Sequence, residues 1–404
     1  MTTATPTTPT AASAAGIKSA VVKTATGRTF NFSAGPGCLP EEVLKQVQQD
    51  VYDIAGTGIG ILEHSHRGKT YDRVLHEAFE DFRKISNLPA NYHLLFLTGG
   101  ASTQNFMVPA NLKPQDQAAD YITTGYWAEK SLEHAKVYGL LHEAATSKDK
   151  NHSYIPSDAQ IKYSASPAYV HFCSNNTIFG TEWHETDAGG NNTWRQRTPA
   201  VPAGVPLVCD MSSDIYSRPV DFTKYGLVYA GAQKNLGAAG TTVVVIRDDL
   251  ATKKVRELPW LLRYETFAKD ESRPNTPPVF AIYVCGLVFK WILAQGQGGR
   301  HCLDVIHERN IRKAGHVYAA IDGSGGFYKG HAEKNSRSLM NLTFKCATPE
   351  LDDKFCKEAA AVGLDGLKGH RSTGGMRAST YNAMPEEGAK VLADFMREFA
   401  RRNG

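Results

Sequence analysis

The sequence lacks any uninterrupted apolar run long enough for a membrane helix, and it lacks a strong excess of charge of either sign. Lys and Arg number 45 and Asp and Glu 41 among 404 residues, which gives a net charge of +4. A membrane helix needs about 18 consecutive apolar residues, and so small a basic excess does not indicate a nucleic-acid binder. Apolar residues make up 42% of the chain and charged residues 21%, an ordinary globular balance. We therefore expect a soluble protein of two or three domains that binds neither membranes nor nucleic acid.

Paired cysteine motifs are also missing. The chain has seven cysteines, none in a Cys-x-x-Cys pair, and most of them lie in apolar stretches. Zinc sites and disulfide frameworks are commonly built on such spacings. The sequence therefore predicts no metal site, and buried free thiols in a reducing compartment such as the cytoplasm.

Acidic residues are absent from the first 28 positions, which consist mainly of Thr, Ala, Ser, Pro and Gly with the basic residues Lys18, Lys23 and Arg28. Such a segment buries too little apolar surface to offset the entropy lost on ordering, so we expect a disordered tail over residues 1–28. The same composition is typical of an organellar transit peptide, which would place the protein in an organelle rather than the cytoplasm.

Short apolar runs alternate with longer amphipathic stretches from Phe30 onward. Strands that alternate with helices form crossover units, so the sequence predicts an α/β fold with a mostly parallel sheet covered by helices on both faces. The expected strands are 92–97, 120–124, 168–173, 206–211, 227–231 and 241–246. The expected helices of this part include 71–85, 127–137, 279–295 and 302–322.

The alternation of short apolar runs with amphipathic stretches begins again after a Gly-rich turn at residues 323–326. We place a domain boundary there, with a large domain over 29–325 and a smaller C-terminal α+β domain over 326–404. A polar segment rich in Gly and Pro, residues 184–204, is expected to be an inserted surface loop. The expected elements of the C-terminal domain are strands at 339–344 and 375–381 and helices at 351–362 and 385–401.

Lys234 and Asp210 are the strongest candidates for chemistry. Lys234 follows an apolar strand in the crowded small-residue segment GAQKNLGAAG, where a lysine can form a Schiff base with an aldehyde cofactor. Asp210 ends the apolar run PLVCD, and the carboxyl ends of parallel strands face the ligand crevice of open α/β sheets. An aspartate there can pair with the pyridinium nitrogen of pyridoxal phosphate. An exposed loop lysine and a helix-capping aspartate remain the alternatives for each segment alone.

Two further strand-to-helix loops fit a flat, phosphorylated cofactor. The first, TGGASTQN, offers glycines and free amides at a helix start, and both favour a phosphate. It lacks the Gly-Lys-Ser/Thr of an NTPase phosphate loop. The second carries Trp127, whose indole can stack on a cofactor ring, although a partly buried core tryptophan fits the loop equally well.

Two Gly-rich segments carry arginines suited to anionic substrates. EHSHRGK contains His66 and Arg67, and GHRSTGGMRAS contains His370, Arg371 and Arg377. The arginine fork matches the paired oxygens of carboxylate and phosphate groups, so these segments suit a substrate with more than one anionic group. Solvated surface arginines are the alternative.

Taken together, these segments resemble the phosphoserine aminotransferase family of class V, fold-type I pyridoxal phosphate enzymes. The resemblance runs over about residues 30–404. The segments that carry it are FNFSAGPGCLP, HSHRGKTYD, LFLTGGASTQNF, TGYWAEK, DMSSDI, YAGAQKNLG, RPNTPPVF and GHRSTGGMRASTYNA. The chain departs from the family in its longer 184–204 loop, in the tail before Phe30, and in Ala101 and Ser102, which replace a Gly-Ala-Arg version of the phosphate loop.

The resemblance implies pyridoxal 5'-phosphate as the cofactor and a homodimer with shared active sites. It makes Lys234 and Asp210 the catalytic residues, with Trp127 stacked on the ring and Thr177 at its phenolic oxygen. It assigns the cofactor phosphate to Ala101, Ser102 and Gln233, and to Asn275 and Thr276 across the dimer interface. It assigns the substrate α-carboxylate to Arg377, and the substrate phosphate or the distal carboxylate of glutamate to His66, Arg67, His370 and Arg371.

The implied reaction moves the amino group of L-glutamate to 3-phosphohydroxypyruvate in serine biosynthesis, with 4-phosphohydroxy-L-threonine of vitamin B6 synthesis as a possible second substrate. A cysteine desulfurase on the same scaffold is the nearest alternative, but it needs a nucleophilic cysteine on a flexible loop, and the cysteines here lie mostly in expected strands or helices. A non-catalytic binding protein would be expected to lose Lys234 or Asp210 first, and both are present.

Overall fold

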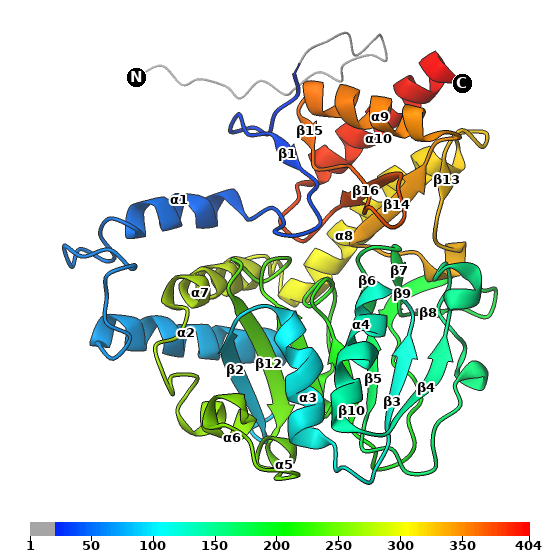
Figure 1. Ribbon diagram of the computed structural model, residues 1–404. Helices are drawn as coiled ribbons and strands as arrows, with labels where there is room; N and C mark the ends of the chain where they lie inside the picture. Colours follow the sequence, from blue (N-terminus) through cyan, green and yellow to red (C-terminus); the bar gives the residue numbers. More distant parts are fainter. Residues whose placement is uncertain (1–20) are drawn as a thin grey trace.

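The computed structural model describes residues 21–404. A large α/β unit carries a smaller α+β unit on top, and the segment containing α1 (Glu41–Asp50) extends to one side (Figure 1). The first 20 residues of the expected tail lie outside the described residues. Within the described part, no helix has the length and apolar character required to cross a membrane.

A seven-stranded sheet forms the centre of the large unit, and only one strand, β12, runs antiparallel to its neighbours. The mostly parallel α/β fold expected from the sequence is therefore confirmed. In spatial order the strands are β2 (Tyr92–Thr98), β12 (Thr241–Arg247), β11 (Leu227–Gly231), β10 (Leu207–Asp210), β5 (Val170–Cys173), β3 (Ala119–Thr123) and β4 (Leu141–Thr146).

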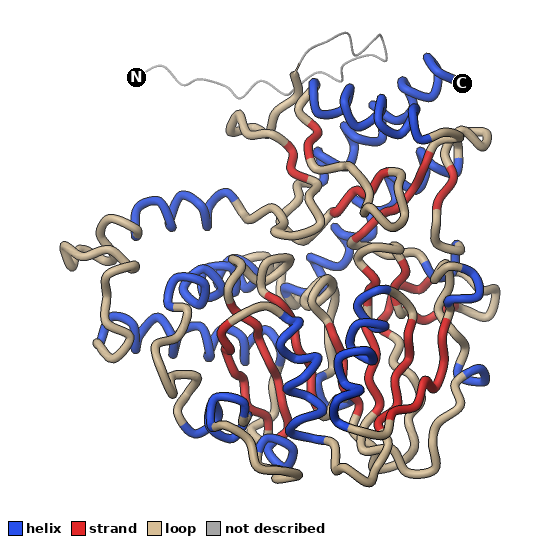
Figure 2. The backbone as a smooth tube through the Cα atoms, in the orientation of Figure 1, coloured by secondary structure: helices blue, strands red, loops and turns tan. Residues whose placement is uncertain are grey.

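Helices cover both faces of this sheet because its strands are apolar on both sides (Figure 2). In β2, Leu94 and Phe96 pack into one core cluster, whereas Leu95 and Leu97 pack into another. The first cluster includes α2 (Lys69–Ser86) and α7 (Val279–Leu293). The second includes α3 (Gln104–Leu112), α4 (Tyr126–Ala135), α5 (Asp248–Ala251) and α6 (Tyr264–Lys269).

The smaller unit has its own core, rich in phenylalanine, between an antiparallel sheet and three helices. Thr348 caps one of these helices by accepting a hydrogen bond from the Leu351 N–H, and Pro349 occupies its first turn. The elements are β13 (Lys329–Gly330), β14 (Asn341–Lys345), β16 (Met376–Ser379), α8 (Cys302–Asp322), α9 (Pro349–Ala361) and α10 (Glu386–Asn403).

The amino-terminal part of the described chain packs onto this smaller unit. Strand β1 (Phe30–Asn31) pairs with β15 (Leu364–Asp365), and the N–H of Val22 donates to the carbonyl of Val362 at 2.8 Å. Residues 21–28 therefore differ from the disordered tail expected of them, and Phe30 and Phe32 belong to the core of the smaller unit. The sequence could not show this, since the pairing partner lies more than 300 residues away.

The expected inserted loop at 184–204 contains a β-hairpin rather than an irregular connection. Strands β8 (His184–Thr186) and β9 (Asn192–Gln196) pair antiparallel, and the rings of His184 and Trp194 lie 4.9 Å apart. The hairpin residues are mostly polar and exposed, so they lack the apolar alternation by which a strand is recognised in a sequence.

Candidate active site

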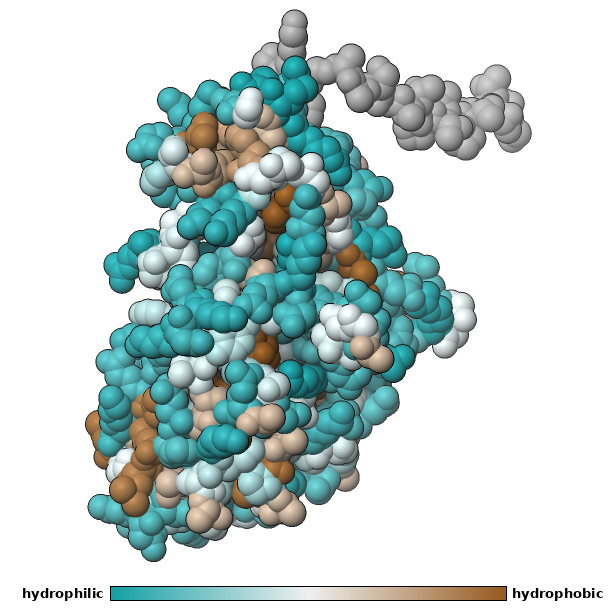
Figure 3. All heavy atoms as spheres, turned by 90° about the vertical axis from the view of Figure 1, so that its right-hand side faces the viewer, coloured by the Kyte–Doolittle hydropathy of each residue, from teal (hydrophilic) through white to brown (hydrophobic). Residues whose placement is uncertain are grey.

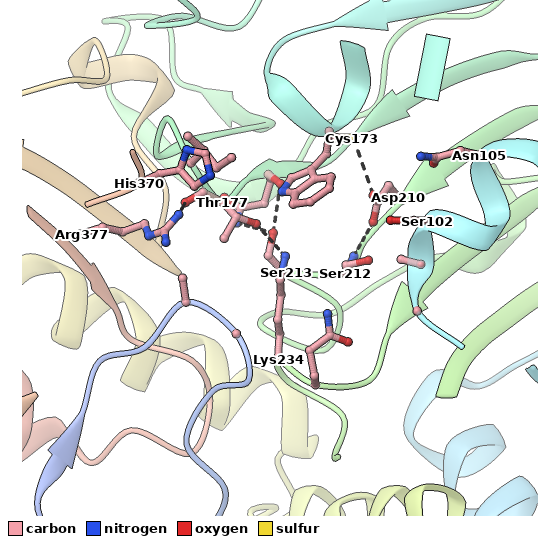
Figure 4. Close-up of a pocket in the computed structure, with 18 residues that line it drawn as sticks. Ser102, Asn105, Cys173, Thr177, Asp210, Ser212, Ser213, Lys234, His370 and Arg377 are labelled. Carbon is pink, nitrogen blue, oxygen red and sulfur yellow. Dashed lines mark hydrogen bonds between the residues drawn. The ribbon is translucent and has the colours of Figure 1, made fainter. Parts of the chain in front are cut away.

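A cavity of about 320 Å³ opens between the large unit and the smaller one, at the carboxyl ends of the parallel strands. It is lined from the loops that follow β2 and β3, from the ends of β5 and β10, and from the loop after β11. His370 and Arg377 face it from the smaller unit (Figure 4). This edge is where ligands bind in open α/β sheets.

Lys234 projects into this cavity from the loop that follows β11. Its Nζ donates a hydrogen bond to Thr177 Oγ1 at 2.8 Å. Burial lowers the pKa of Lys234 to about 8, since the charged ammonium loses its hydration; Asp210 opposes this shift, and Arg377 adds to it. A lysine with this pKa is partly neutral near physiological pH, which a nucleophile or a proton acceptor requires.

Asp210 ends β10 at the same cavity. One of its carboxylate oxygens accepts the N–H of Ser212 at 2.9 Å, and the other receives a weak contact from the Cys173 thiol at 3.9 Å. Burial raises the pKa of Asp210, while the Ser212 hydrogen bond and the charge of Lys234 act in the opposite direction. The arrangement holds a carboxylate that can pair with the protonated nitrogen of a pyridine ring.

Trp127 presents the aromatic surface of the cavity and is 39% exposed. It lies in the first turn of α4, and the Ser131 hydroxyl shares its one proton between the Trp127 carbonyl at 3.0 Å and Asn105 Oδ1 at 2.9 Å. Asn105, on α3, also lines the cavity. These bonds fix the start of α4, and with it the indole, against α3.

The short 3-10 turn Ala101–Thr103, which leads into α3, supplies an anion-binding group of backbone amides. Gly99 has a φ of 101°, a left-handed conformation that glycine adopts at little cost, and it turns the chain from β2 toward Ala101 and Ser102. The free amides at such a helix start favour a phosphate. Gln233 faces the same cavity, and a Cβ at Gly231 would lie 2.7 Å from its Oε1, so the glycine makes room for this side chain.

Arg377, on β16, supplies a second anion-binding group. Its Nη1 donates to the Thr177 carbonyl at 3.2 Å, whereas its buried Nε has no partner among residues 21–404. Burial lowers the pKa of this guanidinium. A buried donor without a partner is costly, and a bound carboxylate would satisfy it. His370 lies nearby, with its pKa lowered by burial and then by the positive charges of Arg377 and Arg371.

The cavity brings together nine of the fourteen residues predicted from the sequence: Ala101, Ser102, Trp127, Thr177, Asp210, Gln233, Lys234, His370 and Arg377. The other five do not line the cavity of their own chain. His66 is half-buried, and Arg67, Asn275, Thr276 and Arg371 are exposed.

Sequence reasoning missed several polar residues that line the cavity. Asn105, Ser212 and Ser213 lie within the quoted motifs and Asn175 lies two residues before Thr177, but sequence reasoning does not assign them to the site. Adjacency to Asp210 was an available signal for the two serines. Cys173 was interpreted only as a buried thiol, because nothing in the sequence places the end of β5 beside the end of β10.

Comparisons with known proteins agree with this geometry. A family described as aminotransferase class-V matches residues 29–392. A phosphoserine aminotransferase of Herpetosiphon aurantiacus is 51% identical over 375 residues, 93% of this chain and 99% of the relative.

Two solved structures extend the likeness to three dimensions. Phosphoserine aminotransferase from Bacillus circulans subsp. alkalophilus superposes with a TM-score of 0.87 at 45% identity, covering 93% of this chain and 99% of that one. A pyridoxal phosphate-bound phosphoserine aminotransferase from Trichomonas vaginalis gives a TM-score of 0.83 at 35% identity, covering 92% and 100%.

Proposed function

Because the chain belongs to the class-V aminotransferases, we propose that it transfers the amino group of L-glutamate to 3-phosphohydroxypyruvate. The products are 2-oxoglutarate and O-phospho-L-serine, a step of serine biosynthesis. The names of its relatives support this choice. The observation that carries it is one cavity holding the half-buried Lys234, the Asp210 carboxylate and an arginine, Arg377, with an unpartnered donor.

The residues of the cavity fit pyridoxal 5'-phosphate as the cofactor. Lys234 would hold its aldehyde carbon, Asp210 its ring nitrogen, Thr177 its phenolic oxygen, and Trp127 the face of its ring. The short 3-10 turn before α3, with Ala101 and Ser102, would hold the phosphate together with Gln233. When bound, the cofactor supplies an electron sink for the carbanion formed at the substrate Cα.

Lys234 is the proposed proton carrier of the reaction. With its pKa lowered to about 8 by burial, the amine can accept a proton from the substrate Cα and return one without a large free-energy cost. Thr177 Oγ1, 2.8 Å from Lys234 Nζ, orients the amine. Arg377 would bind the substrate α-carboxylate through two parallel hydrogen bonds. This contact would orient the Cα–H bond toward Lys234.

The second anionic group of the substrate requires further cations. His370 lines the cavity, and His66, Arg67 and Arg371 complete the proposed site for the substrate phosphate or the γ-carboxylate of glutamate. One site that accepts both groups lets the two half-reactions share a cavity. The same requirement makes 4-phosphohydroxy-L-threonine a candidate second substrate, since it also carries an α-amino acid group and a phosphate.

We propose a homodimer as the active unit, because Asn275 and Thr276 lie outside the cavity of their own chain and would reach the cofactor phosphate of a partner. Exposed apolar side chains on the extended segment that also carries His66 and Arg67 support this interface. Their exposed fractions are 87% for Tyr52, 59% for Leu62 and 43% for Ile59.

The function is tested by a half-reaction of the purified holoenzyme with O-phospho-L-serine in the absence of keto acid. Loss of the visible cofactor band, reversed by 2-oxoglutarate, is the expected result. A visible band that phosphoserine leaves unchanged would contradict the substrate assignment, and a protein that does not take up pyridoxal 5'-phosphate would contradict the cofactor as well. For the dimer, Lys234→Ala and Asn275→Ala subunits are mixed after partial denaturation, and hybrids should regain one functional site.

A further inference from the structure

A second cavity lies where the inserted hairpin meets the large unit. Its volume is about 640 Å³, and none of its lining residues also lines the candidate active site. Its walls come from the end of α2, the hairpin β8–β9, the loop 218–224 and the first turns of α8. The aminotransferase reaction gives this cavity no role.

Charged side chains of both signs surround this cavity. Glu185 on β8, Arg195 on β9, Lys224 and Asp304 at the start of α8 are exposed, and none has an ion-pair partner in the part of the chain that the structure describes. Asp221 differs, because its carboxylate accepts the N–H and the hydroxyl of Thr223. Four unpaired charges from separate segments are therefore available to a ligand.

The buried wall of the cavity adds a donor that lacks a partner. The Arg218 side chain is 1% exposed; its Nη1 contacts Glu182 at 2.7 Å and its Nη2 contacts Asp214 at 3.2 Å. Its Nε has no hydrogen-bond partner within residues 21–404. Buried polar atoms in proteins are nearly always satisfied, so the unpartnered Arg218 N–H points to a ligand that carries an oxygen acceptor.

We propose that this cavity binds a small free α-amino acid in its zwitterionic form. Among the four unpaired charges, the basic Arg195 and Lys224 are matched in number by the acidic Glu185 and Asp304, so the lining favours a neutral molecule with separated charges over a simple anion or cation. The carboxylate would meet the basic residues and the ammonium group the acidic ones.

A protein partner fits this site less well. Figure 3 views the molecule from the side on which β8 and β9 lie in Figure 1, and that face is largely hydrophilic with only scattered apolar spots. Stable protein interfaces have an apolar centre. The hairpin also lies on the opposite side of the molecule from the extended segment that carries the proposed dimer contacts.

Hydrogen bonds join the wall of this cavity to the candidate active site. Arg218 contacts Asp214, and the Ser174 hydroxyl bonds both to the Asp214 carboxylate and, at 3.2 Å, to the main-chain carbonyl of Asp210. A ligand in the second cavity would therefore contact the side chain that begins this path to the cofactor-facing aspartate.

Calorimetric titration of the holoenzyme with glycine tests the proposal, with the visible spectrum recorded in parallel because an amino acid can also react with the cofactor. We expect saturable binding that Asp304→Asn and Lys224→Ala each weaken about fivefold or more. Glu350→Gln, in the first turn of α9, and the exposed Lys254→Ala are the matched controls and should bind glycine like the wild type. Propionate and ethylamine, which each lack one of the two charges, should bind at least fivefold more weakly than glycine.

Three results would overturn the proposal. The first is glycine affinity that Asp304→Asn and Lys224→Ala leave unchanged, since the binding would then belong to the active site. The second is propionate binding as tightly as glycine, which would indicate an anion site. The third is the absence of saturable binding up to about 50 mM glycine, a concentration far above the Kd of about 1 mM of a weak ligand.

Discussion

Lys234 Nζ and Thr177 Oγ1 lie 2.8 Å apart, and this hydrogen bond joins the loop after β11 to the segment after β5. Arg377 reaches the same point from the smaller unit by donating to the Thr177 carbonyl. Thr177 is therefore where the proposed proton carrier and the proposed carboxylate-binding residue meet. The position of Arg377 relative to Lys234 therefore depends on how the smaller unit packs against the large one.

Replacing Lys234 by Ala should remove both turnover and the visible band of the bound cofactor. No other lysine lines the cavity among the described residues, so no neighbour can take over its proton transfer. We expect a loss of about 10⁴-fold or more in kcat. The exposed Lys254→Ala serves as the control, and wild-type-like turnover of Lys234→Ala would refute the assignment.

Uptake of pyridoxal 5'-phosphate by the cofactor-free protein should depend on pH through Lys234. Its pKa is lowered to about 8 by burial, and only the neutral amine attacks an aldehyde. The uptake rate should therefore rise about tenfold per pH unit below this value and become constant above it. Stopped-flow absorbance of the visible band measures this profile.

The uptake profile of an Asp210→Asn variant tests whether Asp210 contributes to the pKa of Lys234. The charge of Asp210 raises the pKa of Lys234 against the effect of burial. In Asp210→Asn that charge is absent, so the midpoint of the uptake profile should move to lower pH. A midpoint that stays in place, or moves upward, would show that the two groups do not interact in this way.

Much of the fold was predictable because the strands are apolar runs bounded by turns. The runs at 227–231 and 241–246 correspond closely to β11 and β12. Two features were not predictable. Strand β1 pairs with a strand distant in sequence, and the hairpin β8–β9 is mostly polar, with its Trp194 ring against His184 and against the core of the smaller unit.

The site was predictable where a motif carries its own chemistry. Lys234 lies on the loop after β11, Asp210 ends β10 and Trp127 lies in the first turn of α4, and all three line the cavity. The position of Asn105 could not be predicted, since it depends on how α3 packs against α4 through Ser131. His66 and Asn275 lie outside the cavity of their own chain, so their roles stay predictions that depend on a second subunit.

Arg377→Lys should weaken the use of amino-acid substrates without removing the cofactor band. Lysine keeps the charge but lacks the fork that would bind a carboxylate through two parallel hydrogen bonds. We expect kcat/KM for O-phospho-L-serine to fall about 30- to 100-fold. Arg312→Lys, exposed on α8, is the matched control. A change of less than about threefold in Arg377→Lys would place the carboxylate elsewhere.

Lys313, buried on α8, should be essential for the stability of the smaller unit. Its Nζ donates to the carbonyls of Thr380, Tyr381 and Met384 at 2.9, 2.8 and 3.2 Å, and so holds the chain between β16 and α10. Lys313→Met keeps most of the apolar stem but leaves three buried carbonyls without their donor. We expect the free energy of unfolding to fall by about 3 kcal/mol or more, measured by urea titration. Lys390→Met, on the exposed face of α10, should change it by less than about 0.5 kcal/mol. Equal effects of the two substitutions would show that the three carbonyls find other donors.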